Sequence, residues 1–199
     1  MERAQSPLTD DERIDWLRLI RTKNVGPRLF IELLDRFGTA AAALDALPGL
    51  ARRGGSRRKF TIPSAASVAA ELSAIDSLGA RTIGLYEPDY PETLAAIADP
   101  PPLLFVSGDV KMLRSPSIAI VGARNASSHS RRFAEEIAGQ LGEAGYTIVS
   151  GLARGIDAAA HNGALTTGTM AAIAGGLDVV YPPEHEELQR RIAATGAVV

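Results

Sequence analysis

Cysteine is absent from this 199-residue chain, so disulfide bonds and thiolate metal sites are excluded. Aromatic residues make up only 5%, and no run of about 18 apolar residues occurs, so we expect no membrane span. The net charge is only -2, so nucleic-acid binding would need a local basic patch. The first ten residues are polar and lack an apolar signal core. These properties are compatible with a cytoplasmic protein, which we predict.

The sequence motifs of several enzyme classes are also missing. A dinucleotide site needs Gly-x-Gly-x-x-Gly after its first strand, but here Gly122 is followed by Ala123 and Arg124. The Gly-Lys-Ser/Thr of nucleotide hydrolases does not occur. His129 and His185 stand alone, without the spacing of metal ligands. We therefore predict a non-enzymatic protein with no catalytic residues, no cofactor and no metal.

What the chain does contain is a pair of strand–glycine–helix turns. Residues 118–121 and 146–149 read as strands, and each runs through a glycine-containing turn with an arginine into a helix. Helix N-termini attract anions, glycine lets the backbone approach them, and arginine binds phosphate oxygens bidentately. The pattern predicts a site for more than one phosphate, and its candidate residues are Gly122, Ala123, Arg124, Ser127, Ser150, Gly151, Arg154 and Gly155. The serines are as well suited to cap helices, and the two roles can coexist.

Two further groups of residues allow two interpretations each. Asp157 and His161, four positions apart on one expected helix, suit either acid–base chemistry or support of the preceding turn. We favour support, because no nucleophile or second carboxylate accompanies them. A basic run is either a solvated loop or an auxiliary nucleic-acid contact, and it comprises Arg52, Arg53, Arg57, Arg58 and Lys59.

Patterning divides the chain into a helical domain at 1–78, a connector with short strands at 79–112 and an alternating strand–helix domain at 113–199. In the helical domain, Thr9 and Glu12 form a capping box, and Pro48 is expected to end an alanine-rich helix. The 24–27 turn resembles a helix–hairpin–helix turn, but Asn24 replaces its usual first glycine, so we favour a packing or protein-contact role.

Strands that alternate with single helices predict a parallel sheet with right-handed crossovers, whose ligands bind beyond the carboxyl ends of the strands. In its first helix, expected at 131–144, Phe133, Ile137 and Leu141 lie near one face. The last residues read as the opening of a strand, which suggests a truncated chain. The predicted fold class is α/β, a Rossmann-like parallel sheet preceded by a small all-α domain.

Several short motifs, in order, resemble the DprA (Smf) family of DNA-processing proteins. They are Val121-Gly122-Ala123-Arg124 with Ala126-Ser127, Ser150 to Asp157 with Ala160-His161, Gly163-Ala164-Leu165, and Gly176-Leu177-Asp178 with Tyr181-Pro182. The helical domain and the Asp99-Pro100-Pro101 connector are also similar, so the resemblance covers most of the chain.

The resemblance implies a SAM-like or helix–hairpin–helix domain and a Rossmann-like domain that binds single-stranded DNA. Such proteins protect incoming DNA in natural transformation, load the RecA recombinase onto it and commonly form homodimers through the Rossmann-like domain. By this analogy, the turn at Arg124 and the residues Ser150, Gly151, Arg154 and Gly155 hold DNA phosphates. The family often has glycine at the position of Ser130, and its members continue past residue 199. The alternative is a nucleotide-binding or phosphoribohydrolase-type enzyme of a related fold, whose Pro-Gly-Gly-x-Gly-Thr-x-x-Glu motif is not found here.

Overall fold

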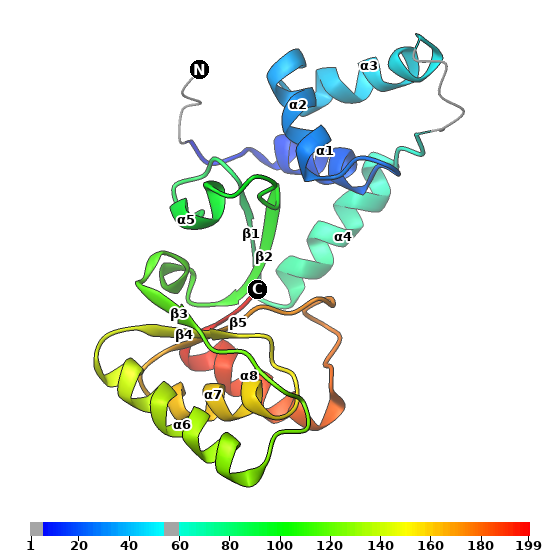
Figure 1. Cartoon of the computed structure of the whole chain (residues 1–199). Coiled ribbons are helices and arrows are strands. Elements are labelled where there is room, and N and C mark those ends of the chain that lie inside the picture. The colour runs from blue at the N-terminus through cyan, green and yellow to red at the C-terminus, as the bar shows by residue number, and fades with distance from the viewer. Residues whose placement is uncertain (1–5, 54–59) are drawn as a thin grey trace. The chain divides into compact units, whose positions relative to one another are not determined.

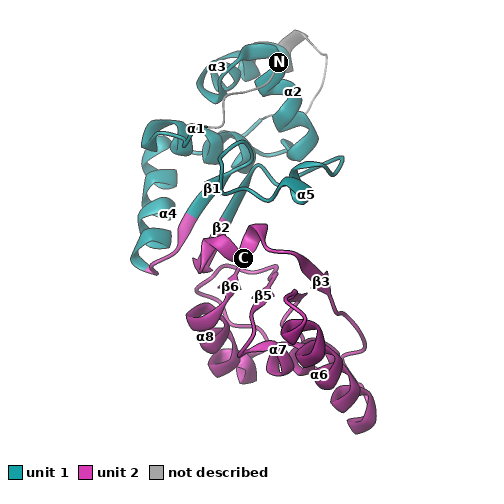
Figure 2. Ribbon diagram, turned by 90° about the vertical axis from the view of Figure 1, so that its left-hand side faces the viewer, with its two compact units in different colours: residues 1–77, 82–104 teal, residues 78–81, 105–199 magenta. Residues whose placement is uncertain are grey.

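The structure, a computed structural model, describes residues 6–53 and 60–199. It divides into two compact units (Figure 2): unit 1 comprises residues 1–77 and 82–104, and unit 2 comprises residues 78–81 and 105–199. The expected connector, residues 79–112, is thus shared between them, because its middle part packs with the helices of unit 1.

Unit 1 is built mainly from helices (Figure 1). They are α1 (Asp10–Arg21), α2 (Pro27–Phe37), α3 (Ala40–Arg53), α4 (Ala65–Ser77) and the short α5 (Glu92–Ala95). The predicted capping box of α1 is confirmed: the Thr9 side chain accepts a hydrogen bond from the Glu12 N–H, and the Glu12 carboxylate accepts one from the Thr9 N–H at 2.8 Å. These bonds to Thr9 lower the pKa of Glu12. Proline starts α2 and Gly38 follows its end, as predicted.

The prediction that Pro48 ends the third helix is wrong, because α3 runs through Pro48 to Arg53. Proline removes one backbone hydrogen bond from a helix interior, a cost of about 3 kcal/mol. Burial of Ala43, Leu44 and Leu47 on the inner face of α3 offsets that cost.

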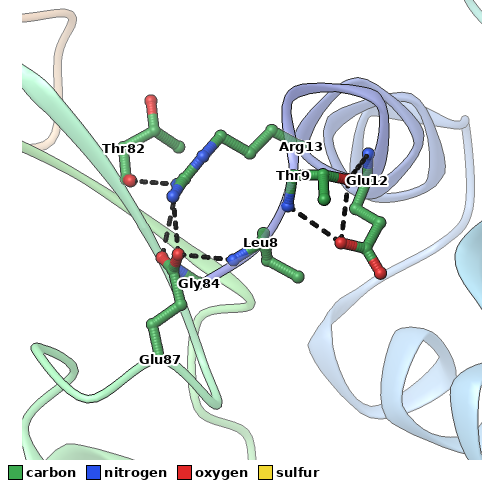
Figure 3. A network of polar contacts seen from close by, with 7 residues as sticks. All are labelled: Leu8, Thr9, Glu12, Arg13, Thr82, Gly84 and Glu87. Atoms are coloured by element: carbon green, nitrogen blue, oxygen red, sulfur yellow. Dashed lines mark hydrogen bonds and ion pairs between the residues drawn. The ribbon is translucent and has the colours of Figure 1, made fainter. Parts of the chain in front are cut away.

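An aromatic cluster and a buried carboxylate hold the non-helical part of unit 1 against α1. The Trp16 ring packs edge-on against Phe30 and Tyr86, with centroids 5.1 and 6.1 Å apart. Glu87 is buried and accepts hydrogen bonds from the Arg13 guanidinium at 2.5 Å and the Leu8 N–H at 2.8 Å (Figure 3). A buried carboxylate is tolerated only when it is paired in this way.

The sheet has the strand order β1-β2-β6-β5-β4-β3. Its strands are β1 (Arg81–Gly84), β2 (Leu103–Gly108), β3 (Ser117–Ala119), β4 (Thr147–Ser150), β5 (Thr169–Ala171) and β6 (Ala197–Val198). The last four pair in parallel, as predicted, whereas β6 pairs with β2 antiparallel, Ser107 opposite Val198.

The crossover helices of unit 2 are α6 (Ser128–Glu143), α7 (Ile156–Ala164) and α8 (Glu186–Thr195), and short 3₁₀ turns stand at η1 (Val110–Arg114) and η2 (Pro183–His185). All three helices lie on the same face of the strands (Figure 1), as successive right-handed crossovers require. The predicted fold class is therefore confirmed. None of the helices in the described part of the chain is long and apolar enough to cross a membrane.

Helices α6 and α7 approach each other very closely. A Cβ added at Gly163 of α7 would lie 2.0 Å from the Glu135 carbonyl oxygen of α6. The face of α6 that packs inward is made of small residues, namely Ala134, Ala138 and Gly142. In consequence Phe133 is 61% exposed and Ile137 36% exposed. Of the three large apolar residues expected near one face, only Leu141 is partly buried and packs against the core.

Candidate phosphate-binding groove

The two predicted turns lie side by side, because β3 and β4 are adjacent parallel strands that end at the same edge. Ala119 pairs with Val149, and beyond this pair the Ile120 N–H donates to the Val149 carbonyl at 2.9 Å. The Ser150 hydroxyl then donates to the Ile120 carbonyl at 2.6 Å, and Ser150 is buried. Ser150 therefore joins the two turns from within, and its hydroxyl proton is already used.

Gly155 brings the second turn into direct contact with the backbone of the first. Its φ is +80°, and an added Cβ would lie 2.2 Å from the Ala123 carbonyl oxygen and 2.6 Å from that of Arg124. The next N–H, of Ile156, donates to the Ala123 carbonyl at 3.3 Å. Only glycine adopts such a φ readily and allows such an approach, so the residue sets the separation of the two turns.

The interior of the second turn is organised by Asp157. This carboxylate is 6% exposed and accepts hydrogen bonds from the N–H groups of Gly151 at 3.2 Å and Ala153 at 3.4 Å. The N–H groups of the turn thus bind a carboxylate of the protein itself, in the way that such groups bind a phosphate in other proteins. The predicted supporting role of Asp157 matches this geometry, and a role for the Gly151 N–H in binding phosphate stays a prediction.

His161 lies beneath the same turn and is fully buried. Its Nδ1 and the Thr169 hydroxyl are 2.7 Å apart, and that hydroxyl donates to the Ile148 carbonyl at 2.7 Å, so Nδ1 carries the proton and donates to Thr169. Burial lowers the pKa of His161 to about 4, although the neighbouring Asp157 opposes this. The ring is thus uncharged at neutral pH and out of contact with solvent, which fits support of the turn and not proton transfer to a ligand.

Leu152 anchors the turn to the core. Its φ is +56°, a left-handed conformation that costs a residue other than glycine about 1–2 kcal/mol. The side chain is fully buried in a cluster with Leu165, Leu188 and Ile192, and this burial offsets the strain. Its carbonyl lies 2.8 Å from the His185 Nδ1.

A basic groove opens beside the two turns. It has a volume of about 570 Å³, and its arginines come from the first turn, the start of α6 and the second turn: Arg124, Arg131, Arg132 and Arg154. Among the described residues, Glu135 is the one carboxylate in its lining, and Ser128, Gly155 and Asn162 contribute small and neutral polar groups. A groove with this excess of guanidinium groups suits an anionic ligand.

Arg154 already has a carboxylate partner within the protein. Its Nε donates to a carboxylate oxygen of Glu184, and this hydrogen bond raises the pKa of Arg154 and lowers that of Glu184. The Arg154 side chain remains 61% exposed, so the pair lies in solvent and contributes little to stability.

Most residues predicted for the site are brought together. Arg124, Arg154 and Gly155 line the groove, and Gly122 faces α7, where an added Cβ would lie 2.7 Å from the Ile156 side chain. Ser127 caps α6, since its hydroxyl accepts from the Ser130 N–H at 3.1 Å. In the basic run, Arg57, Arg58 and Lys59 lie outside the described residues, and the side chains of Arg52 and Arg53 are likewise not described.

Sequence reasoning missed Arg131 and Arg132. They stand near the N-terminus of α6, where the helix dipole disfavours positive charge, and no acidic residue occupies its first turn. Two arginines at an unfavourable end of a helix indicate that an external anion binds there, and the sequence itself contains this signal. In the described part of the chain no three His, Asp or Glu side chains could hold a metal ion together.

Comparison with known proteins identifies the family to which this architecture belongs. Residues 81–199 match the family model of DNA recombination-mediator protein A, and residues 10–74 match the DprA-like N-terminal HHH domain. The chain belongs to the DprA (Smf) family. Protein Smf of Synechocystis is 33% identical over 205 residues, which cover 96% of this chain and 51% of that protein. DprA of Streptococcus pneumoniae is 45% identical over 102 residues, which cover 50% of this chain and 36% of that protein.

Two solved DprA structures share the fold. The X-ray structure of Streptococcus pneumoniae DprA has a TM-score of 0.69 at 28% identity, over 97% of this chain and 67% of that one. The Helicobacter pylori protein, whose structure was determined for its single-stranded DNA binding mode, has a TM-score of 0.53 at 32% identity, over 60% of this chain and 54% of that one. The chain thus spans about half the length of the Synechocystis relative.

Proposed function

We propose that this chain binds single-stranded DNA in the basic groove, with the strand's phosphates contacted by Arg124 and Arg154 and by Arg131 and Arg132. The observation that supports the proposal is the convergence of four arginines on one open groove, whose lining holds a single carboxylate in the part of the chain that the structure describes. Such contacts are independent of base sequence and sensitive to salt.

The geometry favours guanidinium groups over backbone N–H groups as the phosphate ligands of the second turn. The N–H groups of Gly151 and Ala153 are directed to Asp157, and that of Ile156 to Ala123. Of the two kinds of phosphate ligand expected from the sequence, backbone N–H groups and the arginines Arg124 and Arg154, the proposal for the second turn therefore keeps the arginine.

In the cell, we propose that the DNA-bound protein protects incoming single strands and helps load RecA during natural transformation and recombination, as a homodimer and without enzymatic activity. Family membership supports this, and so does the Helicobacter pylori relative described by its single-stranded DNA binding. The burial of Asp157 and His161 supports the non-enzymatic role, since neither side chain faces the groove as an acid or base.

The test is fluorescence anisotropy with a labelled thymidine oligonucleotide at several salt concentrations. We expect Arg124→Ala to weaken binding about 5- to 10-fold and to reduce the salt slope by about one phosphate contact. Arg191→Ala is the matched control, because Arg191 is exposed on α8 and lies outside the groove lining. Equal affinities of the two variants would refute the assignment of the groove.

The alternative, a nucleotide-cleaving enzyme of a related fold, is tested by incubating the chain with nucleoside monophosphates. We expect no release of free base. Turnover that Asp157→Asn abolishes would replace the DNA-binding proposal by an enzymatic one.

A further inference from the structure

Tyr181 is an exposed aromatic side chain that has no role in the proposed binding of phosphates by the groove. It is 71% exposed, although burial of a tyrosine ring is favourable, and it belongs to the segment 175–185 between β5 and α8. Aromatic rings are scarce in this chain, with four tyrosines, five phenylalanines and one tryptophan. Among the exposed aromatic rings of the described residues, Tyr181 has the largest exposed fraction, ahead of Phe133 at 61% and Tyr146 at 41%.

The segment that carries Tyr181 is fixed against the second turn. Glu184 pairs with Arg154, and the His185 ring lies 2.8 Å from the Leu152 carbonyl. On the other side of Tyr181, the Gln189 side chain donates to the Leu177 carbonyl at 3.4 Å. Pro182, the next residue, is buried. The exposed ring thus stands on an anchored backbone.

The position of Tyr181 is close to the groove. Glu184, which contacts Arg154, follows Tyr181 by three positions, and three positions of extended chain span at most about 10 Å. The charge of an ionised Tyr181 would also raise the pKa of Arg154, after the larger effect of Glu184, as expected for two neighbouring side chains. A base attached to a phosphate at Arg154 would therefore lie within reach of the ring.

We propose that Tyr181 is the base-stacking residue of this site, and that it contacts a base of a single strand whose phosphate is bound by Arg154. The inference rests on the proposed function of the groove and adds the base contact by which the site distinguishes single strands from duplexes. In a duplex the faces of a base are covered by its neighbours, whereas a single strand can turn a base onto an aromatic ring. Phosphate contacts alone do not make this distinction.

The experiment compares two oligonucleotides of about 15 nucleotides, one of thymidines and one in which abasic residues replace the bases and leave the phosphates. Tyr181→Ala should bind the thymidine strand about 5- to 10-fold more weakly than the unaltered 199-residue chain does, and the abasic strand equally well. Tyr181→Phe keeps the ring and should restore binding. Tyr146→Ala is the control, because Tyr146 is a 41% exposed tyrosine of the same unit outside the groove lining.

Three results would overturn the inference. Tyr181→Ala could leave thymidine binding unchanged, it could weaken both strands equally, or Tyr181→Phe could be as weak as Tyr181→Ala, which would assign the effect to the hydroxyl. If Arg124→Ala still weakens binding in the same assay, the groove remains the site and only the stacking role fails. If Arg124→Ala has no effect either, the proposed function fails with it.

Discussion

The contact between the two turns at Gly155 allows a sharp test of the site by Gly155→Ala. The added methyl group would lie 2.2 Å from the Ala123 carbonyl oxygen and 2.6 Å from that of Arg124. Both obstacles are backbone atoms, so no side-chain rotation can relieve the clash. The turns must separate, and Arg124 must move away from Arg154.

The expected cost has two parts. A residue with a Cβ at the φ and ψ of Gly155, +80° and −118°, costs about 1–3 kcal/mol, and displacing packed backbone adds about 1–3 kcal/mol. We therefore expect Gly155→Ala to lower the free energy of unfolding by about 2–6 kcal/mol. Gly145→Ala is the matched control, since Gly145 also has a positive φ, +93°, but an added Cβ would meet nothing within 4 Å. Its cost should be about 1–2 kcal/mol.

Urea unfolding followed by far-UV circular dichroism measures the loss, and tryptophan fluorescence supplies an internal reference. The single tryptophan, Trp16, lies in unit 1. The urea midpoint of its fluorescence transition should therefore stay unchanged, while the part of the circular dichroism transition that reports on unit 2 moves to a lower urea concentration. In native buffer, Gly155→Ala should bind the thymidine oligonucleotide at least about 10-fold more weakly, because two phosphate contacts are misplaced. Gly145→Ala should bind normally.

Two outcomes would contradict the reasoning. Equal stability of Gly155→Ala and Gly145→Ala would mean that the turns do not touch as described. A destabilised Gly155→Ala that binds DNA normally would mean that the spacing of the turns does not position the arginines.

Three other predictions follow from the packing around the groove. The pKa of His161 falls from 6.5 to about 4 on folding, so the unfolded chain binds a proton at a higher pH than the folded chain. The free energy of unfolding should therefore decrease by about 3 kcal/mol as the pH is lowered from 6.5 to 4. Urea titrations at several pH values should show a smaller decrease for His161→Gln. Gly163→Ala should destabilise unit 2 by about 1–3 kcal/mol and weaken DNA binding, because an added Cβ lies 2.0 Å from the Glu135 carbonyl oxygen of α6. Gly139→Ala should lower the free energy of unfolding less in the same denaturation assay, because its Cβ would lie 3.3 Å from the Gly163 carbonyl oxygen. Asp157→Asn removes the charge that accepts two turn N–H groups and should cost about 1–3 kcal/mol by thermal or urea unfolding, whereas unchanged stability would show that these bonds are dispensable.

The alternating strands and helices, and the two turns between them, could be predicted because their signals are local. Strand–glycine–arginine–helix occurs within about ten residues at Gly122 and again at Gly151, and a parallel sheet must bring such turns to one edge. The capping box at Thr9 is local in the same way.

The features that could not be predicted depend on partners far away in the sequence. Hydrophobic periodicity draws attention to large residues such as Phe133, but α6 packs on α7 through alanine and glycine, whose small size carries no such signal. That Asp157 would accept the turn's own N–H groups depends on the path of the five intervening residues, 152–156. The partner of Arg154, Glu184, lies 30 residues away in sequence.

The Glu87 carboxylate has a consequence for how the protein is made. Its partners Arg13 and Leu8 precede it by 74 and 79 residues, so α1 gains this partner only after the chain has been synthesised past the end of the helical segment. A fragment that stops at residue 78 would keep four helices and leave the Arg13 guanidinium without this carboxylate. The smallest piece of unit 1 expected to fold on the ribosome therefore ends near residue 104, and pausing of translation before residue 87 would leave α1 open to chaperones and proteases.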